Sequence, residues 1–287
     1  FVSALEIFYL CCFFFFQAED GIRELVRARG LGDVYKRQFL VWRKLAIPSI
    51  LGNLADPLLY VIGLGFGLGM LVREVQGVSY ITFLATGIVC QSTMNSATFE
   101  ALYSAYSRLA TQRTWEAILN APVSLDDIVL AELVWAASKS VLSGAAILLV
   151  ICLFGLSDAW ASLWVLPIIF LIGLTFAALG LCVTALAPSY DFFMYYFTLF
   201  ITPMVLRCGV FFPPEQLPPL VQAVAAWLPL THAVALVRPL LFGEIPSGIV
   251  GHVASLLAVP AISLCPSSLY TPPPPRPHHL SYSPVLF

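Results

Sequence analysis

The stretch SAYSRLATQRTWEAILNAPVSLDD, residues 104–127, separates two long apolar runs and decides how the rest of the chain is interpreted. Within it, Trp115, Ile118 and Leu119 fall at i, i+3 and i+4, which places them on one face of a short helix. The flanking runs carry few charges, whereas this stretch carries Arg108, Arg113, Glu116, Asp126 and Asp127. We predict a short amphipathic helix between two membrane-length segments, which docks on a partner at the cytoplasmic side.

Both ends of this interval carry helix signals. Pro122 ends the short helix, because the residue before a proline is pushed out of the α region. Ser124, followed by Asp126 and Asp127, predicts an N-cap and an acidic first turn for the next helix.

The composition predicts an all-α, polytopic membrane protein. The chain is 60% hydrophobic and 10% charged, against about 25% charged residues in a soluble domain. Its net charge of −2 gives no nucleic-acid footprint. The seven cysteines show no metal-binding spacing, so we expect no metal site and interpret them as small apolar residues.

The two ends of the chain differ from its body. Residues 1–38 hold five of the fourteen basic and five of the sixteen acidic residues, and FFFFQAEDGIRELVRARGLGDVYKRQ resembles translated sequencing-adapter read-through. We expect Phe1–Gln38 to be a non-native artefact. Seven of the last twenty-two residues are proline, so we expect 265–287 to be a frameshifted or disordered tail. The apolar body of the chain is then 39–264, and its last hydrophobic segment is incomplete.

Hydrophobic runs predict six transmembrane helices. Arg43 and Lys44 before the first span, and Arg108 and Arg113 after the second, favour a cytoplasmic N-terminus. The expected spans are 50–70, 80–103, 128–154, 163–186 and 192–211, and a sixth that begins near 247.

Four glycines in the first expected span, Gly63, Gly65, Gly67 and Gly69, form two overlapping G-x-x-x-G patterns. We predict that they let helices approach closely. A nucleotide-binding role is disfavoured, because no strand precedes them and no Lys-Ser/Thr follows.

Glu132 and Lys139 are ionisable residues of the third expected span, about two turns apart on one face. Such residues usually face a bundle interior or a water-filled path. The alternative is that Glu132 lies at the interface and Lys139 extends its amine towards it. The sequence leaves both interpretations open.

The segment after the fifth span is apolar but interrupted by prolines. It includes Phe211, Phe212, Pro213 and Glu215. We predict short re-entrant helices that fold back against protein, since a straight span would not tolerate these breaks.

No catalytic motif is found in the body of the chain. It lacks a P-loop, a zinc-protease motif and a nucleophile elbow. His232 and His252 are isolated in the sequence, and we interpret His232 as a packing residue. We therefore expect a transport subunit rather than an enzyme, with energy supplied by a partner or an ion gradient.

Several strings together resemble the type-2 ATP-binding-cassette exporter permeases, most closely the NodJ-type lipo-oligosaccharide (nodulation factor) exporters. They are VWRKLAIPSILGNLADPLLYVIGLGFGLG, SYITFLATGIV, ATFEALYSAYSRLATQRTWEAILNAPVSLDDIVLAELVWAASKS, VTALAPSYDFFMYY and GVFFPPEQLP. The resemblance covers about residues 39–260. The amphipathic helix that such permeases carry before the first span is missing here or replaced by residues 1–38.

This resemblance implies six spans with both termini cytoplasmic, in the bacterial inner membrane. It implies a permease homodimer and a separate ATPase subunit, which binds ATP and Mg²⁺, so this chain would need no cofactor. Residues 113–122 would be the coupling helix that touches the ATPase, with Arg113, Trp115, Glu116, Ile118, Leu119 and Pro122 as its contact residues. Residues 213–236 would be the re-entrant segment.

Other functions remain open at this point. Drug and polysaccharide exporters use similar permeases. An ion-coupled secondary transporter would suit broken helices and Glu132 with Lys139, but it needs no ATPase contact and the halves show no internal repeat. A membrane scaffold without transport is the third alternative.

Overall fold

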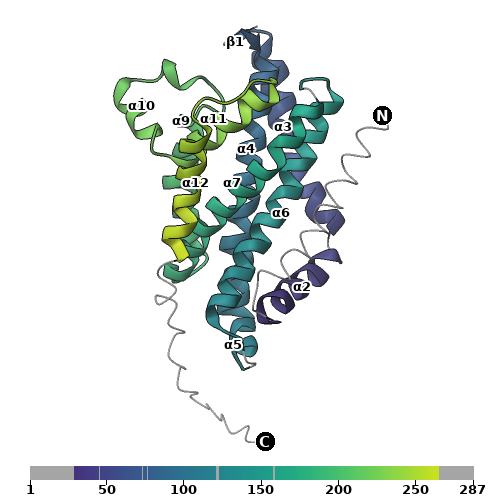
Figure 1. The fold of residues 1–287 in the computed structure, drawn as a ribbon, viewed down its shortest axis with the longest axis vertical. Helices are drawn as coiled ribbons and strands as arrows, with labels where there is room; N and C mark the ends of the chain where they lie inside the picture. The colour runs from purple at the N-terminus through teal and green to yellow at the C-terminus, as the bar shows by residue number, and fades with distance from the viewer. Residues whose placement is uncertain are drawn as a thin grey trace, which may run out of the picture.

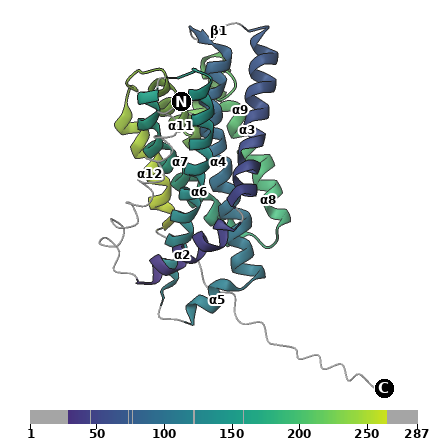
Figure 2. The same cartoon turned by 90° about the vertical axis from the view of Figure 1, so that its right-hand side faces the viewer.

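The computed structural model describes residues 29–264, with gaps at 45, 73, 76, 121–122 and 158. These residues form an elongated helical bundle, with the short helix α5 at one end and the hairpin strand β1 at the other (Figures 1 and 2). The all-α membrane architecture predicted from the composition is confirmed, apart from one two-stranded hairpin, Glu74–Val75 with Val78–Ser79.

Three long helices make the centre of the bundle: α4 (Tyr80–Phe99), α6 (Leu125–Leu153) and α7 (Ala159–Leu186). Small residues bring them together. A Cβ on Gly173 of α7 would lie 3.0 Å from Ala137 Cα of α6, and a Cβ on Gly144 of α6 would lie 2.7 Å from Thr93 Oγ1 of α4. Close backbone approach of this kind is how helices associate in a membrane.

Of the four glycines of α3 (Ala46–Gly69) that we predict to pack against helices, one has such a neighbour within this chain. Only Gly65 touches another helix, since its Cβ would lie 2.9 Å from Ile81 Cγ1. Gly63, Gly67 and Gly69 have open space where a Cβ would stand. Within this chain most of that surface is not used for packing, so the packing role of the other three glycines stays a prediction.

An amphipathic helix, α2 (Arg29–Arg43), precedes α3, at the place where the sequence left such a helix either missing or replaced by residues 1–38. Leu31 and Val34 are buried and form a small cluster with Ala131 of α6. Of the segment Phe1–Gln38, which we predict to be non-native, residues 1–28 lie outside the described residues. Residues 29–38 form the first turns of α2. The non-native origin of this segment stays a prediction, as does the nature of the tail at 265–287, which also lies outside the described residues.

Helix α4 does not stop at the expected end of the second span. It continues through two π-helical segments, Glu100–Ser104 and Ser107–Thr111, to the short helix α5 (Thr114–Leu119). The cap predicted at Ser124 is confirmed as a capping box, in which Asp127 N–H donates to Ser124 Oγ and Ser124 N–H donates to Asp127 Oδ2.

After α7 the chain forms shorter helices, which are separated by turns and by a π segment. It holds α8 (Asp191–Tyr196), a π segment (Phe197–Ile201), α9 (Thr202–Arg207), a 3-10 turn (Pro214–Gln216), α10 (Pro219–Ala225), α11 (Pro229–Leu241) and α12 (Ile249–Leu264). Helices α10 and α11 meet at 85°, the geometry of a broken span or a re-entrant loop.

The number of spans is not established as six. Among the described residues, three helices are long and apolar enough to cross a membrane, or up to four if α10 and α11 count as one bent span. The three are Ala46–Gly69, Leu125–Leu153 and Ser162–Leu186.

Candidate functional site: a buried charge cluster

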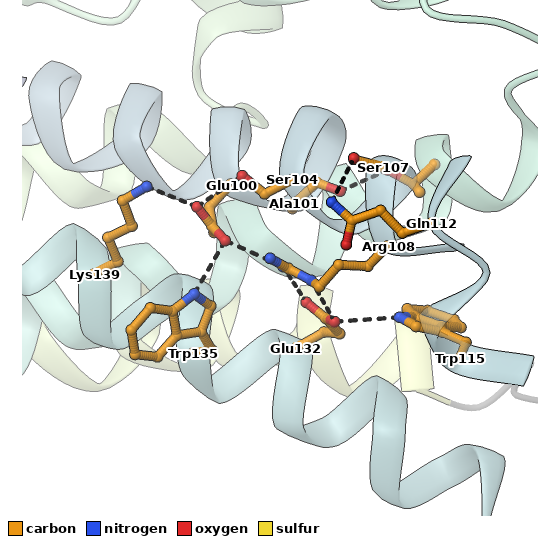
Figure 3. A network of polar contacts seen from close by, with 11 residues as sticks. Glu100, Ala101, Ser104, Ser107, Arg108, Gln112, Trp115, Glu132, Trp135 and Lys139 are labelled. Carbon is orange, nitrogen blue, oxygen red and sulfur yellow. Dashed lines mark hydrogen bonds and ion pairs between the residues drawn. The ribbon is translucent and has the colours of Figure 1, made fainter. Parts of the chain in front are cut away.

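A cluster of four charged side chains lies between the extension of α4 and α6, near α5 (Figure 3). Glu100 and Arg108 come from the π segments that continue α4, and Glu132 and Lys139 come from α6. Both carboxylates are almost fully buried, with 4% and 2% of their side chains exposed. We call these four residues the charge cluster.

Arg108 and Glu132 form a two-point ion pair. Arg108 Nε donates to Glu132 Oε1 over 2.8 Å, and Arg108 Nη2 donates to Glu132 Oε2. Paired parallel bonds of this kind fix the orientation of both groups as well as their distance. Arg108 Nη2 also lies 3.1 Å from Glu100 Oε1, so one guanidinium joins the two carboxylates.

Glu100 accepts three further hydrogen bonds. Lys139 Nζ donates to its Oε2 over 2.7 Å, Trp135 Nε1 to its Oε1 over 3.0 Å, and Ser104 Oγ to its Oε2 over 3.0 Å. A buried carboxylate is tolerated when its oxygens are occupied by cations and hydrogen-bond donors, as they are here.

The π-helical segments give the cluster its geometry. A π turn inserts an extra residue per turn, and such turns are common at functional sites. Glu100 begins the first π segment and Arg108 lies in the second, so both backbone distortions fall where the cluster forms.

The chain leaves the second π segment through a strained residue. Arg113 has φ +48°, the only positive φ of a non-glycine residue among those described. A left-handed backbone is costly for a residue with a Cβ and concentrates at functional sites. It turns the chain sharply into α5.

The predicted docking face of α5 needs correction. Trp115 is only 2% exposed, and its Nε1 donates to Glu132 Oε1 over 3.2 Å, so it faces α6 and not a partner. Ile118 and Leu119 are half-buried and pack against the core. The exposed residues of this region are instead Gln112, Arg113, Glu116, Ala117 and Asn120. The predicted contact residue Pro122 lies outside the described residues.

Glu132 and Lys139 both form ion pairs with residues of the α4 extension, and their depth in the membrane stays a prediction. They do not join each other: Glu132 binds Arg108, whereas Lys139 binds Glu100.

A cavity of about 560 Å³ opens beside the charge cluster. Aromatic side chains and the charged groups share its wall, which includes residues of α2, α3, the α4 extension, α5 and α6, and Tyr190 just before α8. Its lining includes Trp42, Glu100, Tyr103, Arg108, Gln112, Glu132, Trp135, Lys139 and Tyr190.

The predicted re-entrant residues lie at the opposite end of the bundle, with β1 (Figure 1). Phe211 packs its ring 6.3 Å from that of Tyr60, Pro213 is buried, and Phe212 and Glu215 are exposed. Arg238 of α11 holds this segment to α4. Its Nη2 donates to Gly209 O over 2.6 Å and its Nε donates to Thr86 Oγ1 over 3.2 Å.

Several of these groups were not identified as site residues from the sequence. Arg238 was visible as a lone cation in an apolar run, which is a signal in its own right. His232 and His252 looked isolated, yet their Nδ1 atoms lie 2.8 Å apart across α11 and α12. Twenty residues separate them in the chain, so no local spacing could have paired them.

Comparison with known proteins places this arrangement in a family. The model of the ABC-2 type transporter family matches residues 33–242, which include the charge cluster, α5 and Arg238. The chain belongs to the ABC-2 type transporter family. It is therefore the membrane subunit of a transport system, a multi-pass protein built from apolar helices.

Individual known proteins are similar over most of the chain. Nodulation protein J of Bradyrhizobium diazoefficiens is 50% identical over 240 residues, which cover 83% of this chain and 92% of that protein. Nodulation protein J of Rhizobium meliloti is 51% identical over 211 residues, covering 74% and 80%. The inner membrane transport permease YadH of Escherichia coli is 22% identical over 195 residues, covering 68% and 74%.

Proposed function

We propose that this chain is the permease subunit of an ATP-driven exporter that moves a lipo-oligosaccharide or a similar amphiphile out of the bacterial cytoplasm. The observation that carries the proposal is the 50% identity to a nodulation protein J along 92% of that protein. A separate ATPase subunit hydrolyses ATP with Mg²⁺, and this chain provides the path.

The ATPase binds the end of the bundle that carries α5, which is the cytoplasmic end. Support comes from the exposed polar groups there, among them Gln112, Arg113 and Glu116. Charged and amide side chains at and just before a short helix suit a groove rimmed by complementary charges. The permease forms a homodimer, and the open glycine face of α3 offers room for a second copy.

The charge cluster disfavours ion-coupled transport. A proton- or sodium-coupled carrier needs a carboxylate that can exchange its partner during the cycle. Glu100 already contacts Lys139 and Arg108, and Glu132 holds Arg108 at two points. Both carboxylates are thus committed to structural ion pairs.

The test is purification of the chain with an ATP-binding-cassette ATPase subunit from the same organism, followed by reconstitution in lipid vesicles. We expect two copies of each subunit by native mass spectrometry, and ATP hydrolysis stimulated by a fluorescent N-acylated oligosaccharide. Stimulation by a hydrophobic drug or an unacylated polysaccharide instead would reassign the substrate. Transport driven by an ion gradient without the ATPase would refute the proposal.

A further inference from the structure

We propose that Trp115 and Glu132 are positioning residues that transmit movement of α5 to the spans α4 and α6. This inference rests on the proposed function, because it requires an ATPase that displaces α5.

The first step is the contact between α5 and α6. Helix α5 has only six residues, and a loop that includes 121–122 connects it to α6. A loop alone could absorb a movement of α5. The Trp115 side chain removes that freedom, because its ring is buried and its Nε1 is 3.2 Å from Glu132 Oε1.

The second step is the rigidity of the Glu132 carboxylate, which accepts the hydrogen bond from Trp115. Glu132 cannot rotate freely, because the two-point bond from Arg108 fixes its carboxylate plane. Removing one member of such a buried pair leaves an unpaired charge, which is strongly unfavourable. A displacement of Trp115 therefore moves α6 in preference to breaking the ion pair.

The third step carries the movement to a second helix. Arg108 lies on the continuous extension of α4 and reaches Glu100 as well as Glu132. Glu100 in turn is bonded to Lys139 of α6. These ion pairs join the extension of α4 to α6 close to α5. A movement of one rigid helix is transmitted to another when the two are joined in this way.

The burial of Trp115 distinguishes this role from docking. Trp115 is covered by the permease, so it is not available to the ATPase. Loss of its indole N–H should leave the docking surface intact and weaken only the later transfer of movement to the spans.

The experiment uses Trp115→Phe, which keeps an aromatic ring and removes the hydrogen-bond donor. The full chain is co-purified with its ATPase, reconstituted, and assayed for export of the fluorescent N-acylated oligosaccharide per ATP hydrolysed. Trp164→Phe is the matched control, because Trp164 of α7 is 72% exposed. We expect normal ATPase stoichiometry and a fall of about three- to thirty-fold in export per ATP for Trp115→Phe, with no change for the control.

Export per ATP equal to that of the unsubstituted protein would overturn the inference while leaving the proposed function standing. Failure of the unsubstituted chain to bind an ATPase would overturn both. A measurement on the unsubstituted complex covers the case in which Trp115→Phe does not assemble. We expect hydrogen exchange of α5 and of α6 around Glu132 to change together when a non-hydrolysable ATP analogue binds, and a change in α5 alone would refute the coupling.

Discussion

The guanidinium carbon of Arg238 lies 3.7 Å from the centre of the Phe83 ring, which joins α11 to the first turn of α4. A cation over an aromatic face gains about 2 kcal/mol or more when both are removed from water. With its bonds to Gly209 O and Thr86 Oγ1, Arg238 holds the segment between α9 and α11 against the bundle.

Replacement of Arg238 should loosen that segment. We expect Arg238→Gln to lower the free energy of unfolding by about 2 to 4 kcal/mol, from the lost cation–π contact and charge-assisted bonds. Hydrogen exchange of residues 209–217 should accelerate. The control is Arg207→Gln, an exposed cation at the end of α9. Equal effects of the two substitutions would show that Arg238 has no special structural role.

Single and double substitutions in the charge cluster should change the free energy of unfolding by amounts that do not add. We expect Glu100→Gln to destabilise the permease by about 3 to 5 kcal/mol, because it leaves Lys139 and Arg108 as excess positive charge. Adding Lys139→Met should restore part of that loss. Thermal unfolding in detergent measures both changes. If the double variant loses as much stability as the two single variants together, Glu100 and Lys139 do not stabilise each other.

The exposed side of α5 should control ATPase binding. We expect Arg113→Glu with Glu116→Lys to reduce co-purification of the ATPase, since charge complementarity at its groove would be inverted. Glu74→Lys is the control, because Glu74 is exposed on β1 at the other end of the bundle. Normal ATPase binding by the double variant would show that the docking surface does not include Arg113 and Glu116.

The orientation of the bundle is open to a direct measurement. Positive charge at Arg43, Lys44, Arg108 and Arg113 favours a cytoplasmic location for the α5 end. A reporter fused after Gln112 should read cytoplasmic and one fused after Gly77 external. The reverse result at either position would invalidate the proposed topology.

Local features of this fold could be predicted from the sequence, and relations between helices could not. The capping box at Ser124 depends on residues three apart, so the sequence contains all of it. The helical face of Trp115 was also correct, but periodicity says nothing of what covers a face. The pairing of Arg108 with Glu132 spans twenty-four residues and depends on π turns that no sequence signal announced.

The glycines of α3 also show that a sequence pattern does not predict which helices come into contact. The G-x-x-x-G pattern predicts a surface that accepts a close neighbour, and Gly65 has one in Ile81. Which residues of the pattern meet a helix of the same chain depends on how α3 is rotated against α4. That rotation is set by the packing of the whole bundle, not by the glycines.

The balance of the charge cluster has an electrical consequence. Moving one elementary charge through the full membrane potential involves about 2.3 kcal/mol per 100 mV. The cluster combines Arg108 and Lys139 with Glu100 and Glu132, so it carries no net charge when all four are ionised. Its displacement as a unit along the membrane normal therefore does no net electrical work. This part of the permease can change position at the same energetic cost in a strongly polarised cell and in a depolarised one.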